Sequence, residues 1–200
     1  MSLDVKKPQV IPGVLKLYVK IPIDRIKVLT TNNMQVLKEL ESRTLTKITI
    51  DEINSFALVE PSSSNTPVIN VMKARDFINA VAVGFSPEKA WRILNDDQII
   101  ITIDLKTVVG DSQNHLTRIK GRVIGEEGKV KKNIEEMTGT NISVYEDYIA
   151  IIGDYDGANL AREAVEMLIQ GRQHSTVYKY LDRSVHDVKK KKVTTIWNKD

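Results

Sequence analysis

The Gly-x-x-Gly loop at residues 125–128 constrains the fold more than any other part of this sequence. Three apolar residues follow the loop at the spacing of one face of an amphipathic helix: Val130, Ile134 and Met137. Gly139 is then suited to end that helix. A second helical pattern precedes the loop, so the two glycines would let the backbone turn sharply between two helices and allow another molecule to approach it closely. The unpaired N–H groups at the start of the second helix would face the same space, which makes the loop a candidate phosphate-binding site.

The elements on either side of the loop distinguish this site from an ordinary turn between helices. An apolar run at 99–105 precedes the first helix. After the second helix, residues 141–145 alternate as in a strand, and a polar turn leads to an apolar run at 148–153. A further amphipathic helix stops near Gly171. This order is that of a type I KH domain, whose Gly-x-x-Gly loop clamps the backbone of about four single-stranded nucleotides.

The N-terminal half has the same order of elements but lacks the glycines. Residues 47–50 match 141–144, and the helix that follows Pro67 matches the one that follows Asp156. The position of the Gly-x-x-Gly loop is occupied by 31–34, Thr-Asn-Asn-Met, whose side chains would obstruct a phosphate. We therefore predict an internal duplication in an α+β fold: two tandem type I KH-like domains, each a three-stranded antiparallel sheet backed by helices. The first domain is expected to be a scaffold without the clamp.

These patterns divide the chain into five predicted parts. They are a flexible N-terminal arm at 1–13, a degenerate KH-like domain at 14–84, a linking helix at 85–97, a KH domain with the Gly-x-x-Gly loop at 98–172, and a C-terminal extension with a basic tail at 173–200. The linking helix has a good N-cap in Ser86 followed by Pro87, and we expect it to pack between the domains. The basic run at 189–192 is either a phosphate contact or a solvated tail.

Composition excludes several classes of function. The chain of 200 residues has no cysteine, so neither a disulfide nor thiol chemistry is available. No apolar run approaches the roughly 20 residues that span a bilayer, and no signal-peptide core is present, so we expect a cytoplasmic protein without membrane contact. The net charge is only +3, so nucleic-acid binding must depend on local patches. The three histidines are scattered, and no metal set or nucleophile–base pair is apparent, so we predict no enzyme activity, no metal and no cofactor.

The predicted RNA interface surrounds the loop. Gly125 and Gly128 would give close approach to the RNA backbone, whereas Glu126 and Glu127 oppose a phosphate by about 0.7 kcal/mol each at roughly 6 Å in water. An apolar floor for the bases is expected from Ile124, Ile142 and Val144, each of which could instead belong to the core. Six cations are candidates for phosphate pairing: Arg118, Lys120, Arg122, Lys129, Lys131 and Lys132.

Two further features near this interface also call for an interpretation. Tyr145 and Tyr148 flank the turn between the last two strands, where they could stack on a base or simply belong to the hairpin. The acidic pair Glu135-Glu136 is interpreted as solvated helix surface.

The sequence resembles the archaeal relatives of the partner-of-Nob proteins, tandem-KH factors of small ribosomal subunit assembly, over about 14–183. The resemblance implies binding of single-stranded RNA near the 3′ end of small-subunit rRNA, cooperation with the Nob endonuclease that trims that end, and association with the alpha subunit of translation initiation factor two. Archaeal members usually keep glycines in the first loop and basic residues in the second, and this chain departs from both patterns. The stretches that carry the resemblance are 18–22, 72–76, 84–90, 121–125, 134–139 and 177–181.

Two alternatives remain at the level of sequence. The missing first loop and the acidic second loop favour a protein-interaction scaffold of ribosome assembly or translation initiation with secondary RNA contacts. A general messenger-binding KH protein is the third possibility. These alternatives differ in the salt dependence of RNA binding and in preference for the ribosomal 3′ end.

Overall fold

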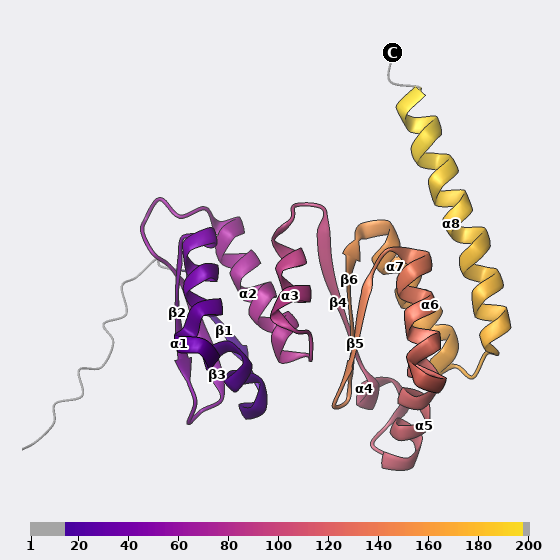
Figure 1. Ribbon diagram of the computed structural model, residues 1–200, viewed down its shortest axis with the longest axis horizontal. Coiled ribbons are helices and arrows are strands. Elements are labelled where there is room, and N and C mark those ends of the chain that lie inside the picture. Colours follow the sequence, from indigo (N-terminus) through magenta and orange to yellow (C-terminus); the bar gives the residue numbers. More distant parts are fainter. Residues whose placement is uncertain (1–14, 198–200) are drawn as a thin grey trace, which may run out of the picture.

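The computed structural model describes residues 15–197, except for the side chains of Asn32, Lys189 and 191–197. The predicted arm at 1–13 therefore lies outside the described residues. Two three-stranded antiparallel sheets lie one after the other along the long axis of the molecule (Figure 1). The strand order is β1-β3-β2 in the first sheet and β4-β6-β5 in the second, so the last strand of each unit is central. This equivalence confirms the predicted α+β fold with two KH-like units.

The helices and strands follow the predicted order closely. The first unit contains β1 (Leu17–Lys20), α1 (Ile23–Thr44), β2 (Thr46–Asp51), β3 (Phe56–Pro61) and α2 (Val68–Ala82). The link contains α3 (Pro87–Ala90) and the 3-10 helix η1 (Trp91–Leu94). The second unit contains β4 (Gln98–Asp104), α4 (Leu105–Val109), α5 (Gln113–Ile124), η2 (Glu126–Gly128), α6 (Lys129–Thr138), β5 (Asn141–Tyr145), β6 (Tyr148–Asp154) and α7 (Tyr155–Ile169), and α8 (His174–Trp197) follows it.

A repeated hydrogen bond shows how closely the two units correspond. The Glu41 carboxylate accepts the backbone N–H of Ile48 at 2.6 Å, and the Glu135 carboxylate accepts that of Ile142 at 2.7 Å. Each bond ties a helix to the strand that follows it: α1 to β2 in the first unit, and α6 to β5 in the second. The same numbering offset aligns 31–34 with the Gly-x-x-Gly loop, as the sequence predicts.

The interpretation of Glu135 as solvated helix surface was wrong. Its side chain is only 15% exposed and accepts the backbone N–H of Ile142 in β5, whereas Glu136 is 64% exposed and forms a long ion pair with Lys132. A backbone N–H that must be paired next to the core explains the difference.

The loop in the first unit keeps the left-handed backbone of the last two Gly-x-x-Gly positions without the glycines, whereas Thr31, which corresponds to Gly125, does not have a positive φ. Asn33 and Met34 have φ values of 57° and 59°, close to the 52° and 76° of Glu127 and Gly128 in the second unit. Asparagine tolerates this left-handed region better than most residues, but a methionine there is strained. The Met34 side chain is 47% exposed, so the place where a phosphate would approach carries a large apolar group.

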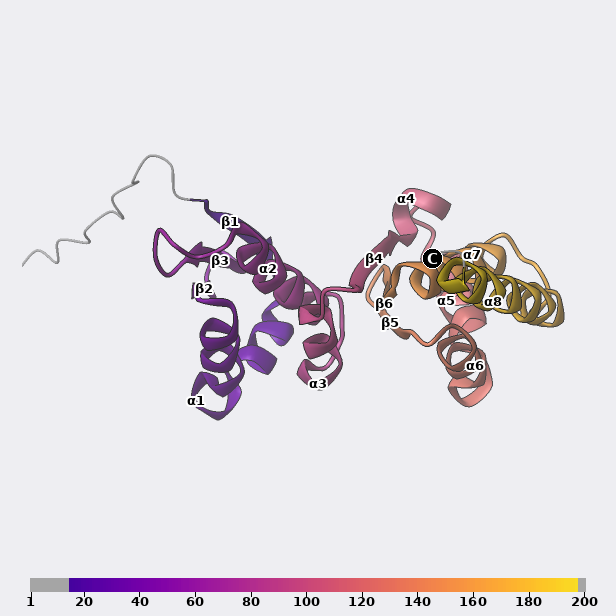
Figure 2. The same ribbon diagram turned by 90° about the horizontal axis from the view of Figure 1, so that it is seen from above.

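The two units share a hydrophobic core, because α2 and the link together cover the face of the second sheet that α5, α6 and α7 leave free. Ala150 and Ile152 of β6 belong to the same buried cluster as Phe77 and Ile78 of α2. As expected, the link lies between the sheets (Figure 1). The centre of the Trp91 ring in the link is 4.4 Å from the centre of the Phe77 ring of α2. Seen from above, α2 and α3 approach the second sheet side by side (Figure 2). Because the core is shared, the boundaries at 84 and 98 remain predictions.

Candidate nucleic-acid interface

The two loop glycines have different structural roles. Gly125 has φ 73° and ψ 177°, and a Cβ there would lie 2.3 Å from Cγ2 of Val130. Gly128 has φ 76° and ψ 9°, and a Cβ there would meet no atom within 4 Å. Gly125 therefore allows the loop to close onto α6, whereas Gly128 leaves an open surface at the start of that helix.

Backbone donors surround the open surface at Gly128. The N–H of Gly128 donates to the Gly125 carbonyl at 3.2 Å, and the N–H of Lys129 donates to the Glu126 carbonyl. In the described part of the chain, the N–H groups of Glu126 and Glu127 donate to no backbone carbonyl outside their own 3-10 turn. No side chain caps the N-terminus of α6. Unpaired N–H groups and the positive end of the helix dipole thus meet here, an arrangement suited to a phosphate.

Three of the six predicted cations are exposed on the two helices that flank the loop. Arg118 of α5 has no hydrogen-bond or ion-pair partner among the described residues. Lys129 pairs with Glu127 at 3.1 Å, and Lys132 pairs with Glu136 at 3.7 Å. Such exposed ion pairs contribute little stability, so both lysines can exchange their carboxylates for phosphates at small cost.

The other three predicted cations have structural partners instead. Nε and Nη2 of Arg122 donate to the carbonyls of Leu168 and Arg172 at 3.2 and 2.6 Å, which caps the end of α7. Lys131 is half-buried and pairs with Glu135 at 3.4 Å. Nζ of Lys120 donates to the Glu146 carbonyl at 3.0 Å and so joins α5 to the turn between β5 and β6. Helical spacing is compatible with the Lys131–Glu135 pair, four residues apart, but gives no sign of the distant partners of Lys120 and Arg122.

The predicted apolar floor is divided by the alternation of β5. Ile142 is 2% exposed and lies in the core of the second unit, so it cannot touch a base. Val144 is half-buried at the edge of the same core. Ile124 is 37% exposed and directly precedes the loop. Only Ile124 and Val144 can therefore contact a base without opening the core.

The structure favours a structural role for Tyr145. Its hydroxyl donates to the Asp24 carboxylate of the first unit at 2.7 Å. Burial, and after it this hydrogen bond, raise the pKa of the Tyr145 hydroxyl, so the group remains a donor at neutral pH. The sequence offers no signal for this contact, because the two residues lie in different units.

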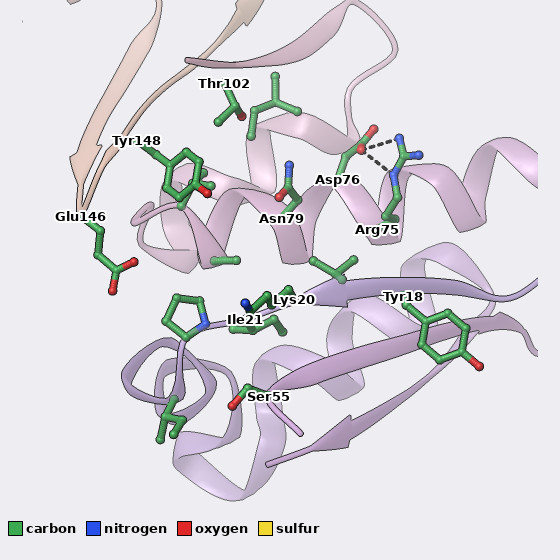
Figure 3. Close-up of a pocket in the computed structure, with 16 residues that line it drawn as sticks. Tyr18, Lys20, Ile21, Ser55, Arg75, Asp76, Asn79, Thr102, Glu146 and Tyr148 are labelled. Atoms are coloured by element: carbon green, nitrogen blue, oxygen red, sulfur yellow. Dashed lines mark hydrogen bonds and ion pairs between the residues drawn. The ribbon is translucent and has the colours of Figure 1, made fainter. Parts of the chain in front are cut away.

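A cleft of about 850 Å³ opens between the two units (Figure 3). Lys20 and Ile21 of the first unit form one wall, and Asp76 and Asn79 of α2 form the back. Side chains of the second sheet and its turn cover the cleft: Thr102, Glu146 and Tyr148. None of the predicted RNA-binding residues lines this cleft, so it is separate from the surface around the Gly-x-x-Gly loop.

Two findings bear on other kinds of site. Among residues 15–197, no three His, Cys, Asp or Glu side chains are placed to hold a metal ion. Within that same range, no helix combines the length and the apolar character needed to cross a membrane.

The known proteins that this chain resembles include KH-domain proteins. Residues 99–186 match the model of the eukaryotic-type KH domain, KH-domain type I. A KH domain-containing protein of Methanocaldococcus jannaschii is 37% identical over 180 residues, which are 90% of this chain and 78% of that protein. The RNA-binding protein pno1 of Dictyostelium discoideum is 32% identical over 161 residues, 80% of this chain and 67% of that protein. A chain in the crystal structure of an a/eIF2alpha–aDim2p–rRNA complex from Pyrococcus horikoshii is 40% identical, with a TM-score of 0.81 over 88% of this chain and 96% of that chain.

Proposed function

The chain belongs to the archaeal partner-of-Nob family of PNO1/Dim2-type KH proteins, and from this premise we propose that it holds single-stranded rRNA near the 3′ end of small-subunit rRNA while that RNA is processed. In this proposal, the protein is a factor of ribosome biogenesis that binds RNA and does not catalyse a reaction. The same proposal places it in the cytoplasm, together with the RNA that it holds. Its fold is that of its relatives, and the surface around the Gly-x-x-Gly loop has the groups that would bind the RNA.

One observation supports the proposal above all others. The open surface over Gly128 coincides with unpaired N–H groups of the loop and with the N-terminus of α6. A phosphate can approach there past no side chain other than those of the neighbouring Glu127 and Lys129, and the N–H groups can donate to its oxygens. The remaining members of the proposed site are the exposed cations, which pair with neighbouring phosphates, and the two accessible apolar side chains, which contact bases: Arg118, Lys129, Lys132, Ile124 and Val144.

The remaining predicted residues act indirectly in this proposal. Lys120, Arg122 and Lys131 hold the helices and the turn in place and add positive potential near the RNA. Gly125 permits the loop to close, and Ile142 anchors β5 in the core. Glu126 and Glu127 weaken binding at the loop by repulsion of the phosphate.

The proposed partners follow from the relatives. The Pyrococcus horikoshii structure contains aDim2p together with a/eIF2alpha and rRNA. We extend both partners to this chain: the 3′ region of small-subunit rRNA and the alpha subunit of translation initiation factor two. The Nob endonuclease is the third proposed partner, because this chain would hold the RNA end that the endonuclease trims.

A scaffold that binds proteins first and RNA second is the competing function, and the acidic loop is the observation that favours it. Glu126 and Glu127 are both exposed, and of the two only Glu127 has an ion-pair partner among the described residues, Lys129. A phosphate bound at this loop would be repelled by the two carboxylates, whereas a protein partner need not carry negative charge there.

Charge reversal in the loop separates the two functions. We expect the double variant Glu126→Lys/Glu127→Lys to bind a 3′-terminal rRNA fragment about tenfold more tightly at low salt, because repulsion is removed and Lys129 is released. The log–log salt slope should steepen by about 0.7 for each additional phosphate that the new lysines neutralise. Fluorescence anisotropy across a salt series measures both quantities.

The matched control is Asp97→Lys/Asp182→Lys, which changes net charge equally at two exposed carboxylates outside the loop. It should tighten binding much less. Equal tightening by both double variants would mean that only overall charge matters, and the loop would then not be the phosphate site.

A further inference from the structure

Strand β5 forms one wall of the proposed RNA groove, and its two faces contact different units. Ile142 and Val144 point toward the helices of the second unit. On the other face, the Ser143 hydroxyl donates to the Val83 carbonyl at 2.9 Å, and the Tyr145 hydroxyl donates to Asp24 at 2.7 Å. Because side chains alternate along a strand, every second residue of this wall is held by the N-terminal unit.

The start of β5 is held in the same way. Nη2 of Arg92 in the link donates to the Gly139 carbonyl at 2.7 Å, and Nη1 reaches the Asn141 side-chain oxygen at 3.4 Å. The strand is thus attached to residues outside the second unit at its beginning, middle and end.

Tyr145 is the most elaborate of these attachments. The Arg25 guanidinium lies 5.5 Å from the centre of the Tyr145 ring and donates to the carbonyls of Val81 and Phe85, the first at 2.8 Å. Gly84 packs directly beneath the tyrosine, since a Cβ at its φ of 98° would lie 2.4 Å from the tyrosine Cβ. A cation, a carboxylate and a bare backbone from the first unit therefore enclose one side chain of the second.

The turn between β5 and β6 borders the cleft, so the attachment of Tyr145 to the first unit affects the position of that turn. Glu146 and Tyr148, which follow Tyr145 in the hairpin, border the cleft of about 850 Å³, so this side of the turn faces open space (Figure 3). On the groove side, among the described residues, only the hydrogen bond from Lys120 to the Glu146 carbonyl reaches the turn from a helix that borders the loop.

At the start of α4, the Leu105 N–H donates to the Asp147 carbonyl at 2.8 Å and Lys106 pairs with the Asp147 carboxylate at 2.9 Å, so the β6 side of the turn is held within the second unit. The hydrogen bond from Tyr145 to Asp24 adds a restraint from the first unit at the β5 end of the turn.

We propose that the first unit, which lacks a phosphate clamp, acts as a rigid support for the RNA groove of the second, with Asp24 and Arg25 as positioning residues that act through Tyr145. The proposal rests on the function proposed above and extends it. A wall held in place before RNA arrives loses less conformational freedom on binding, which strengthens binding although the first unit itself does not touch the RNA.

The direct test is Tyr145→Phe, which removes only the hydroxyl. We expect about fivefold weaker binding of a 3′-terminal rRNA fragment with an unchanged salt slope, because the same cations still pair with the phosphates. Tyr155→Phe is the matched control, since that side chain is 70% exposed at the start of α7 and belongs to none of the proposed RNA-contacting residues. The double variant Asp24→Ala/Tyr145→Phe should bind no more weakly than the weaker single variant, because both changes break the same hydrogen bond.

A second measurement separates positioning from general destabilisation. Coupling between sites is reciprocal, so RNA should slow amide hydrogen exchange at residues 81–85 of the wild type and do so less in Tyr145→Phe. Equal RNA affinity for Tyr145→Phe and Tyr155→Phe, or RNA-induced protection at 81–85 that is identical in both, would overturn the proposal. If Glu126→Lys/Glu127→Lys also leaves affinity unchanged, the proposed function fails as well. If that loop variant changes affinity as expected and Tyr145→Phe does not, only the positioning role is refuted.

Discussion

Gly128→Asp is expected to weaken RNA binding by about thirtyfold, or about 2 kcal/mol, while the protein remains folded. A Cβ at Gly128 meets no atom within 4 Å, and aspartate tolerates the left-handed backbone better than most residues. The new carboxylate would occupy the surface proposed for a phosphate, close to the unpaired N–H groups of the loop. Anisotropy titration with a single-stranded rRNA fragment measures the loss, and circular dichroism checks the fold.

Gly128→Asn is the control for this prediction, because asparagine has nearly the same shape and no charge. We expect it to weaken binding by only a fewfold, since the amide occupies space without repelling the phosphate. Equal losses for the two variants would indicate that steric obstruction dominates at Gly128. No loss for either variant would exclude a phosphate from this surface.

Gly125→Ala is expected to lower the stability of the second unit by about 2–4 kcal/mol, which corresponds to a melting temperature lower by about 6–12 °C. The added Cβ would lie 2.3 Å from Cγ2 of Val130 and 2.9 Å from its backbone nitrogen, at a φ of 73°. Either the loop must move away from α6 or the backbone must leave its left-handed conformation. Differential scanning calorimetry measures the loss.

Gly121→Ala provides the comparison within the same helix. A Cβ at Gly121 meets no atom within 4 Å and its backbone is helical, so alanine should leave stability unchanged or raise it by up to about 1 kcal/mol. The contrast between two glycines four residues apart isolates the loop geometry. Similar melting temperatures for Gly125→Ala and Gly121→Ala would contradict the tight packing of the loop on Val130.

The sequence predicted the order of elements because each element is specified locally. The apolar spacing along α7 indicated its buried face, and Ala161, Ala164 and Leu168 are all fully buried. The alternation of β5 placed its bounds at the observed residues. The duplication was visible because both copies keep the same strand pattern, and the repeated Glu41 and Glu135 hydrogen bonds now give it a structural basis.

The site was predicted less completely, because its members are selected by contacts between distant segments. Arg122 and Lys129 look alike in sequence, yet the first caps α7 and the second faces solvent. Strand alternation could not decide which face of β5 meets the core, and so Ile142 was included in the floor of the groove. The hydrogen bond between Asp24 and Tyr145 of β5 joins the two units, and no local sequence pattern can predict a contact between residues so far apart in the chain.

The most direct test of the proposed function is the affinity for a 3′-terminal small-subunit rRNA fragment compared with a shuffled strand of equal length, measured from low to high salt. We expect tighter binding to the ribosomal fragment at every salt concentration. The log–log slope should be about −2, as three exposed cations paired with single-stranded phosphates would give. Equal affinity for both strands would indicate a general RNA-binding protein, and binding that is weak and insensitive to salt would contradict the RNA clamp itself.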